Sequence, residues 1–487
     1  MSRPALVAAA IFAATLASRA PFLSQHLWAW DSVLYARALE SGFHVDYALA
    51  GQRPHPPGYV LYVATASAMR GLTGDSNTAL VLIAALASAL AAAALYLFGR
   101  RFVSDRAAAF AAVAFAVDPL VWQYSEVAYP YTVLSLLSVS VAAGFFFARG
   151  RGTATAAMLA SAAFGVAAGF RQDLLLILAA LWLWLIWPLP GRFRLAAATT
   201  VGAGCLVWLI PTAVLSGGPL AYADALLRQT DYVRATYSVL AQGLPALSTN
   251  LAATLYALAW GLGICTVPIA GLAFAGARRA VRARRIVLTG TDAFLIAWIL
   301  PALSLYALVH IGEWGYVLSV LPGLYVLGAI GVDRAVRIPR PLRRSALAAA
   351  VVATAVIFVA TAAPFSAAAI ARQDAELAAR VKYVRQHYSH ETTLILARED
   401  FLLVRYYLPE YRTWFHDFDP YRTTLRRKRA PNVGAIIVFS PGLKAASLEA
   451  RRVECAAGVH LVYLDIEPGS IVELYGERYT IVESARR

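Results

Sequence analysis

The residues best suited to chemistry lie in a polar stretch between the first two apolar segments of the chain. Asp31 follows Trp28 and Trp30 and precedes a helical pattern over residues 32–40. Its position predicts either the N-cap of that helix or a carboxylate that acts as a general base. Further along, His55 precedes two prolines, which cannot continue a helix and therefore predict a stiff turn. A histidine there either faces solvent or binds a phosphate oxygen or a metal ion.

Two further candidates lie where later apolar runs meet polar loops. Arg171 could bind a phosphate, but snorkelling or pairing with Asp173 explains it equally well. Glu126 shares its loop with Tyr129, and a carboxylate among aromatic faces suits a sugar ring. An acidic residue in a loop at the membrane surface would show the same sequence pattern. A sugar-binding role and a plain loop position for Glu126 therefore both stay open.

His310 and Glu313 are the candidate metal ligands. They are three residues apart in a short polar loop. A divalent metal ion or a lipid phosphate would suit them, but two ligands alone do not make a metal site.

The composition indicates a multi-spanning membrane protein. Of the 487 residues, 60% are apolar and only 15% are charged, and the mean hydropathy is +0.61. Soluble domains contain about 45–50% apolar and about 25% charged residues. The net charge of +15 does not indicate a nucleic-acid partner, because most arginines lie in short loops between apolar runs.

The apolar runs predict about eleven transmembrane helices, since a bilayer core needs about 20 apolar residues per span. Residues 59–69 are too few to cross, and we expect them to form an interfacial helix on the membrane surface. The predicted spans are residues 4–23, 77–98, 106–123, 130–148, 154–170, 173–188, 195–215, 252–275, 292–309, 315–332 and 346–363.

The arginine distribution predicts the orientation of these spans. Clusters at residues 278–285 and 334–344 fall in loops on the same side as the N-terminus. Because cytoplasmic loops are enriched in arginine, we expect a cytoplasmic N-terminus. The first loop, residues 24–76, and the C-terminal part of the chain then face the periplasm of a bacterial inner membrane.

The chain changes character near residue 365. Residues 392–397 and 434–439 have the pattern of buried strands, and residues 367–388 have helical periodicity. Residues 459–466 and 471–482 predict a further strand and a hairpin. We therefore expect two domains: a transmembrane module over residues 1–364 and a small α/β periplasmic domain over residues 365–487.

Five motifs follow one another along residues 1–365. They are W-D-S-x-x-Y-A-R-A-L at 30–39, H-P-P-G-Y at 55–59, S-E-V-A-Y-P-Y-T at 125–132, G-F-R-Q-D-L-L-L at 169–176 and H-I-G-E-W-G-Y-V-L-S-V-L-P at 310–322. In their order and their places between the apolar runs, they resemble membrane glycosyltransferases of the GT-C superfamily, nearest to protein O-mannosyltransferases and lipid A aminoarabinose transferases. The resemblance covers roughly residues 1–365.

This resemblance implies the inverting transfer of a sugar, such as a hexose of the mannose type, from a polyprenyl-phosphate carrier to an acceptor hydroxyl. The catalytic acid of the first outer loop falls on Asp31, which would act as the general base. The leaving lipid phosphate then needs a cation or a divalent metal ion. The predicted donor-binding residues are His55, Tyr59, Glu126, Tyr129 and Arg171, with His310 and Glu313 as metal ligands.

Two departures from the family pattern affect these expectations. Ser32 follows Asp31 where many relatives carry a second acid, and His55 stands where the aminoarabinose branch often has lysine. They leave the metal requirement and the phosphate contact open.

The sequence also leaves the acceptor and two rival functions open. The acceptor hydroxyl would belong to a protein, a lipid or a glycan, in contact with membrane lipids. Composition alone would also suit a transporter or a flippase for lipid-linked sugars, or a non-catalytic partner in envelope polysaccharide assembly. Transporters usually have ionisable groups in mid-membrane, whereas the candidates here lie in loops and at span ends, which favours an enzyme.

Overall fold

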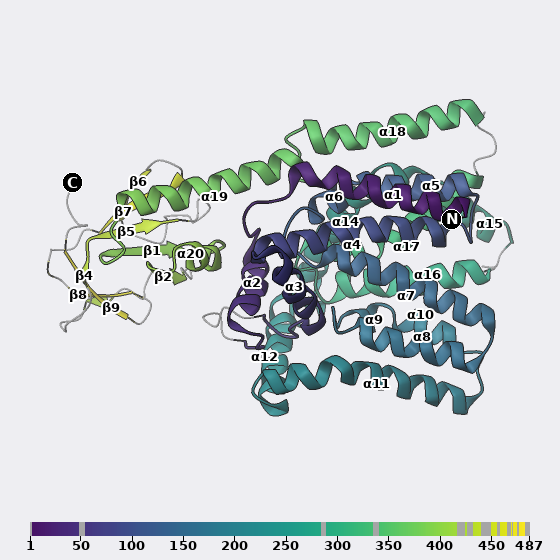
Figure 1. Ribbon diagram of the computed structural model, residues 1–487, viewed down its shortest axis with the longest axis horizontal. Helices are drawn as coiled ribbons and strands as arrows, with labels where there is room; N and C mark the ends of the chain where they lie inside the picture. The colour runs from purple at the N-terminus through teal and green to yellow at the C-terminus, as the bar shows by residue number, and fades with distance from the viewer. Residues whose placement is uncertain are drawn as a thin grey trace. The chain divides into compact units, whose positions relative to one another are not determined.

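The computed structural model of the chain describes residues 2–47, 54–283, 289–334, 340–415, 424–425, 432–439, 450–454, 458–464, 469, 471–474 and 477–482 (Figure 1). The chain divides into two compact units. The first comprises Met1–Ser24 and Tyr35–Ile370, and the second comprises Gln25–Leu34 and Ala371–Arg487.

The first unit is built from helices, most of which are apolar. The helices of the chain up to residue 360 are α1 (Arg3–Arg19), α2 (Trp30–Ser41), α3 (Val60–Thr73), α4 (Ser76–Gly99), α5 (Asp105–Val117), α6 (Pro119–Tyr124), α7 (Tyr131–Arg151), α8 (Ala154–Ala167), α9 (Leu174–Ile177), α10 (Ala179–Ile186), α11 (Gly191–Leu215), α12 (Pro219–Tyr237), α13 (Val239–Gln242), α14 (Leu244–Leu262), α15 (Thr266–Ala283), α16 (Gly290–Leu308), α17 (Leu321–Arg334) and α18 (Arg340–Ala360).

Six described helical segments are long and apolar enough to cross a membrane, and they confirm six of the predicted spans. They are Arg3–Phe22, Ser76–Gly99, Tyr131–Arg151, Gly191–Leu215, Leu244–Arg279 and Gly290–Leu308. Two more predicted spans are shorter apolar helices, Ala154–Ala167 and Ser345–Ala360. The chain is thus a polytopic α-helical membrane protein.

The three remaining predicted spans are interrupted helices. In one of them α5 ends before Asp118, whose carboxylate accepts hydrogen bonds from the amides of Leu120 and Val121 and so caps α6. Pro119 occupies the first position of α6, where its missing N–H costs nothing. The second is divided into α9 and α10, and the third into a 3-10 helix (Trp314–Ser319) and α17.

Helices α8 and α11 pack closely because glycine faces glycine. A Cβ added at Gly204 would collide with the backbone carbonyl of Ala162, and one added at Gly165 would collide with the carbonyl of Val201. Small residues of this kind let helix backbones approach in a membrane, where no hydrophobic effect drives association.

Helix α3 covers residues 60–69 of the predicted interfacial helix and extends four residues beyond them, to Thr73. It has 14 residues and follows Tyr59, which adopts a left-handed conformation with φ of 53°. The amide of Leu61 donates a hydrogen bond to the carbonyl of Gly169 over 3.1 Å. A Cβ at Gly169 would stand 2.6 Å from both Leu61 and Trp208, so glycine is required for this close approach. The location of α3 on a membrane surface stays a prediction.

The second unit contains a small α/β domain. Its elements are α19 (Ala367–His387, which begins in the first unit), β1 (Thr393–Ala397), α20 (Phe401–Tyr407), β2 (Arg412–Phe415), β3 (Thr424–Leu425), β4 (Asn432–Val433), β5 (Ala435–Val438), β6 (Ala450–Glu454), β7 (His460–Leu464), β8 (Ile471–Leu474) and β9 (Glu477–Ile481). One sheet has the order β2-β1-β5-β7-β6, in which β1 pairs in parallel with β2 and β5, and the other has the order β3-β8-β9-β4. The predicted strands, helix and hairpin are confirmed.

A buried arginine fastens α19 to this domain. The Arg380 guanidinium lies 2.9 Å from the Asp400 carboxylate and donates a 3.2 Å hydrogen bond to the carbonyl of Phe439. Its side chain is only 8% exposed. Helix α19 therefore has a fixed position on α20 and on the end of β5 within this unit.

Candidate functional site

Arg171 is the centre of the polar cluster in the first unit. It lies in the turn between α8 and α9 and is only 4% exposed. Its Nε atom donates to both oxygens of Asp173, the nearer at 2.9 Å. The guanidinium carbon also lies 4.5, 4.9 and 5.5 Å from the ring centroids of Tyr316, Tyr131 and Tyr59. A cation that is buried away from water interacts strongly with any anion that reaches it.

Two tyrosine hydroxyls connect this cluster to Glu313. Tyr129 donates to one carboxylate oxygen of Glu313 over 3.1 Å, and Tyr124 donates to the other over 3.3 Å. The rings of Tyr124 and Tyr129 also lie 5.1 and 5.2 Å from that of Tyr131. Glu313 and Arg171 thus contact one shared group of aromatic rings.

His310 joins the cluster through Tyr316. Their rings are 5.9 Å apart at 85°, and on its other side His310 packs against Tyr237 at 4.3 Å. Burial, together with the charge of Arg171, lowers the pKa of His310 to about 4. The imidazole is therefore neutral at pH 7, and its Nδ1 atom is buried and has no hydrogen-bond partner among the residues that the structure describes.

The His-Pro-Pro turn reaches the cluster through Tyr59. The Nδ1 atom of His55 is 2.7 Å from the carbonyl oxygen of Pro56, and its ring lies edge-on to that of Tyr59 at 6.3 Å. The Tyr222 hydroxyl donates to the carbonyl of Pro57 over 3.1 Å and holds the turn in place. Tyr59 thus contacts both the His55 ring and the Arg171 guanidinium.

Glu126 belongs to a different cluster. Its side chain is fully buried, and its Oε1 atom accepts a 2.6 Å hydrogen bond from the indole of Trp122. Burial raises the pKa of this carboxyl, and the charge of Arg19 opposes that effect. The guanidinium of Arg19 in turn lies over the Trp122 ring at 4.6 Å. The structure therefore does not bring Glu126 together with Arg171.

Asp31 lies in the second unit, within the segment Gln25–Leu34. It is half-buried in the first turn of α2. The carbonyl of Ala29 accepts the amide of Val33, and the Ser32 hydroxyl accepts the amide of Ala29. Ala29 is therefore the cap residue, and the N-cap interpretation of Asp31 is wrong. The helix N-terminus favours a negative charge on Asp31, the state that a general base requires.

The residues that the structure describes do not group into a complete metal site. Among the residues that the structure describes, no group of three or more histidine, cysteine, aspartate or glutamate side chains could hold a metal ion. Both oxygens of Glu313 accept tyrosine hydroxyls, and His310 offers a single neutral nitrogen. The metal role of His310 and Glu313 stays a prediction.

Two groups of residues that contact the candidate residues or their segment were missing from the sequence prediction. Tyr316 contacts both Arg171 and His310, and its place in the H-I-G-E-W-G-Y motif was the available signal. Asp374 and Tyr407 bind the backbone of the segment that carries Asp31. Nothing in the sequence marked them, because their contacts span more than 340 residues.

Comparisons with known proteins agree with this fold. A family model described as dolichyl-phosphate-mannose-protein mannosyltransferase matches residues 54–216. The crystal structure of ArnT from Cupriavidus metallidurans bound to undecaprenyl phosphate superposes with a TM-score of 0.56 at 16% identity, covering 94% of this chain and 97% of that chain. The apo structure of the same protein gives a TM-score of 0.55 at 14% identity, with the same coverage. No curated protein matches by sequence. The chain therefore shares the fold of the ArnT structures, and its residues 54–216 match the mannosyltransferase family model.

Proposed function

We propose that this protein transfers a sugar from a polyprenyl-phosphate carrier to an acceptor hydroxyl, with inversion, at the outer face of a bacterial inner membrane. The observation that carries the proposal is the buried Arg171 cation with tyrosines against its guanidinium. A buried cation with aromatic walls suits a donor that combines a phosphate with a sugar ring. The similar ArnT structure contains undecaprenyl phosphate, which supports a carrier of this class.

In this mechanism Asp31 and Arg171 have opposite roles. The Asp31 carboxylate accepts the proton of the acceptor hydroxyl as its oxygen attacks the anomeric carbon. The bond from that carbon to the phosphate oxygen breaks, and its electron pair leaves with the lipid phosphate. Arg171 stabilises the negative charge of the leaving phosphate, and His55 and Tyr59 bind the same end of the donor. The acceptor belongs to a protein, a lipid or a glycan.

Transfer from a radiolabelled polyprenyl-phosphate hexose by purified protein tests the proposal. We expect the Asp31→Asn variant to lose about 10²- to 10⁴-fold in kcat while its thermal stability stays close to that of the wild type. Undiminished transfer by this variant would show that Asp31 is not the base. Movement of labelled lipid across vesicles without a glycosidic product would indicate a flippase instead.

A further inference from the structure

We infer that the C-terminal domain positions the general base, with Asp374 and Tyr407 as positioning residues. This inference rests on the proposed role of Asp31. It starts from the composition of the second unit, in which Gln25–Leu34 and Ala371–Arg487 form one compact body. A ten-residue piece of the first outer loop, including Asp31, therefore belongs to the fold of the domain that follows the last membrane helix.

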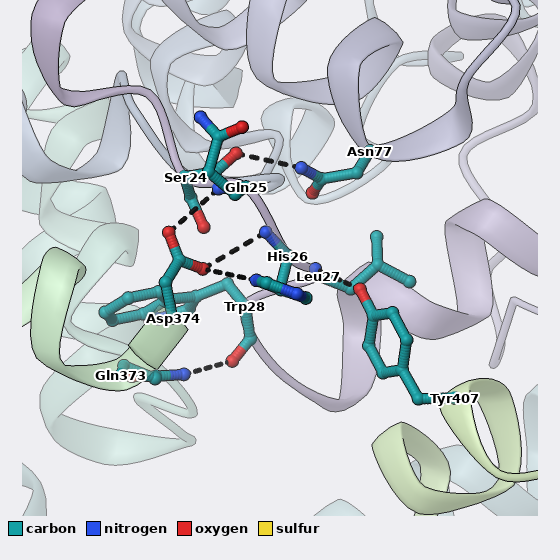
Figure 2. A network of polar contacts seen from close by, with 9 residues as sticks. All are labelled: Ser24, Gln25, His26, Leu27, Trp28, Asn77, Gln373, Asp374 and Tyr407. Atoms are coloured by element: carbon teal, nitrogen blue, oxygen red, sulfur yellow. Dashed lines mark hydrogen bonds and ion pairs between the residues drawn. The ribbon is translucent and has the colours of Figure 1, made fainter. Parts of the chain in front are cut away.

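Asp374 makes the main attachment. One carboxylate oxygen accepts the amide of Gln25 over 2.8 Å, and the other accepts the amide of His26 over 3.1 Å (Figure 2). The latter oxygen also lies 3.4 Å from Nδ1 of His26. A carboxylate that accepts two consecutive amides fixes the direction of the chain as well as its position, and such charge-assisted bonds are among the stronger ones in proteins.

The next residues are bound in the same way. The amide of Leu27 donates to the Tyr407 hydroxyl over 2.8 Å, and the carbonyl of Trp28 accepts the side-chain amide of Gln373 over 2.5 Å (Figure 2). Four consecutive residues, 25–28, are thus attached through their backbone to side chains of α19 and α20.

Aromatic packing extends this attachment to the residue before Asp31. The ring of Trp30 lies 6.0 Å from that of Phe401 in α20 and 5.9 Å from that of Phe415 in β2. Buried Arg380 holds α19 against α20, so the donors and acceptors of the attachment have a rigid support. The entry to α2, and with it Asp31, is thereby fixed by the domain. A general base needs this order, since a displacement of about 1 Å can cost about 100-fold in rate.

Variants of Asp374 and Tyr407 test this positioning in the full-length protein. Asp374→Asn keeps the shape but only one acceptor oxygen, Asp374→Glu keeps both, and Tyr407→Phe removes one acceptor while preserving the ring. Glu410→Gln is the matched control, because Glu410 pairs with Arg385 in the same domain at 3.0 Å. Two quantities are measured: kinetic constants with a radiolabelled polyprenyl-phosphate hexose, and hydrogen exchange of the backbone amides of residues 25–27.

We expect Asp374→Asn to lower kcat about 10- to 100-fold and to change KM for the donor by less than about threefold. Asp374→Glu should recover part of the lost kcat, and Tyr407→Phe should lower kcat to a smaller extent. The amides of residues 25–27 should exchange faster in Asp374→Asn and Tyr407→Phe, and at the wild-type rate in Glu410→Gln.

The outcomes separate the inference from the proposed function. Full kcat in Asp374→Asn and Tyr407→Phe, with Asp31→Asn inactive, would overturn the positioning role and leave the proposed function intact. Equal losses in Asp374→Asn and Glu410→Gln would also overturn it, because a general loss of domain stability would then be sufficient. Full activity of Asp31→Asn would overturn the proposed function itself.

Discussion

Arg171 and Asp173 form an ion pair in which Nε lies 2.9 Å from the nearer carboxylate oxygen. The arginine side chain is 5% exposed and that of the aspartate 24%. Asp173 binds Nε, while tyrosine rings lie against the guanidinium. A phosphate that approaches Arg171 must therefore compete with an intramolecular carboxylate.

This competition predicts opposite effects of two substitutions on donor binding. Arg171→Gln should raise KM for the donor about tenfold or more, because the cation is lost. Asp173→Asn should lower it, because the cation becomes free. Removing one partner of a buried pair also costs about 3–5 kcal/mol of stability, so Asp173→Asn should melt at a lower temperature. Polyprenyl phosphate should raise that temperature more than it does in the wild type.

Steady-state kinetics and thermal melts with and without polyprenyl phosphate measure both effects. A change of KM in the same direction in the two variants would contradict the competition. Arg171→Lys is the conservative control, since lysine keeps the charge but loses the planar guanidinium that lies against the tyrosines.

The lowered pKa of His310, about 4, predicts a dependence of stability on pH. Histidine in the unfolded chain has a pKa near 6.5. Between pH 6.5 and 4 the imidazole of residue 310 is therefore protonated in the unfolded state but neutral in the folded state. The free energy of unfolding should therefore fall as the pH drops through this window, by roughly 3 kcal/mol at most. Melting temperatures across pH 4–8 measure the slope. His310→Gln should flatten it, and an unchanged slope in that variant would contradict the assignment to His310.

The contact between α8 and α11 predicts that alanine is tolerated at Gly202 but not at Gly204, although both glycines lie in α11. Gly204→Ala should destabilise the protein by about 1–3 kcal/mol, because the new methyl group meets the backbone carbonyl of Ala162. Gly202→Ala should be neutral or stabilising by up to about 1 kcal/mol, because no atom lies within 4 Å of its added Cβ and alanine favours helix. Thermal melts in one detergent compare the two variants. Equal melting temperatures would contradict the glycine-mediated approach.

Glu313 offers a test of a metal role against a purely structural one. Glu313→Gln leaves one of the two tyrosine hydroxyls facing an amide nitrogen and the other with a neutral acceptor, and it should cost about 1.5–3 kcal/mol. Tyr124→Phe removes one of the same two bonds but leaves the Glu313 carboxylate charged and bonded to Tyr129. It should therefore lower the free energy of unfolding by less. Melting temperatures with and without Mn²⁺ distinguish the roles. A rise with Mn²⁺ in the wild type but not in Glu313→Gln would support metal binding by Glu313.

The parts of the fold that the sequence predicted are those set by local pattern. Long apolar runs gave six full spans, and β1 and β5 followed from short buried runs between polar turns. The interruption at Asp118 was less visible, because Asp-Pro within an apolar run changes hydropathy very little. The capping bonds to Leu120 and Val121 show where α5 ends and α6 begins.

The sequence predicted most residues of the candidate site, but it did not predict which of them lie together. His55, Tyr59, Tyr129, Arg171, His310 and Glu313 meet around shared tyrosine rings, as their positions at loop boundaries allowed. Glu126 has the same local signature as these residues, yet it packs against Trp122. Its carboxyl interacts with the charge of Arg19, which is more than 100 residues away in sequence, and no local pattern records such a pairing.

The membership of Gln25–Leu34 in the second unit has a practical consequence for protein engineering. Consider a chimera that exchanges the C-terminal domain between relatives at residue 371. It would pair the α19 of one protein with the segment 25–34 of another, although side chains of α19 bind the backbone of that segment. We expect such a hybrid to keep its helices and sheets but to hold Asp31, the proposed general base, in the wrong position. A functional graft has to carry residues 25–34 together with the domain that begins at residue 371.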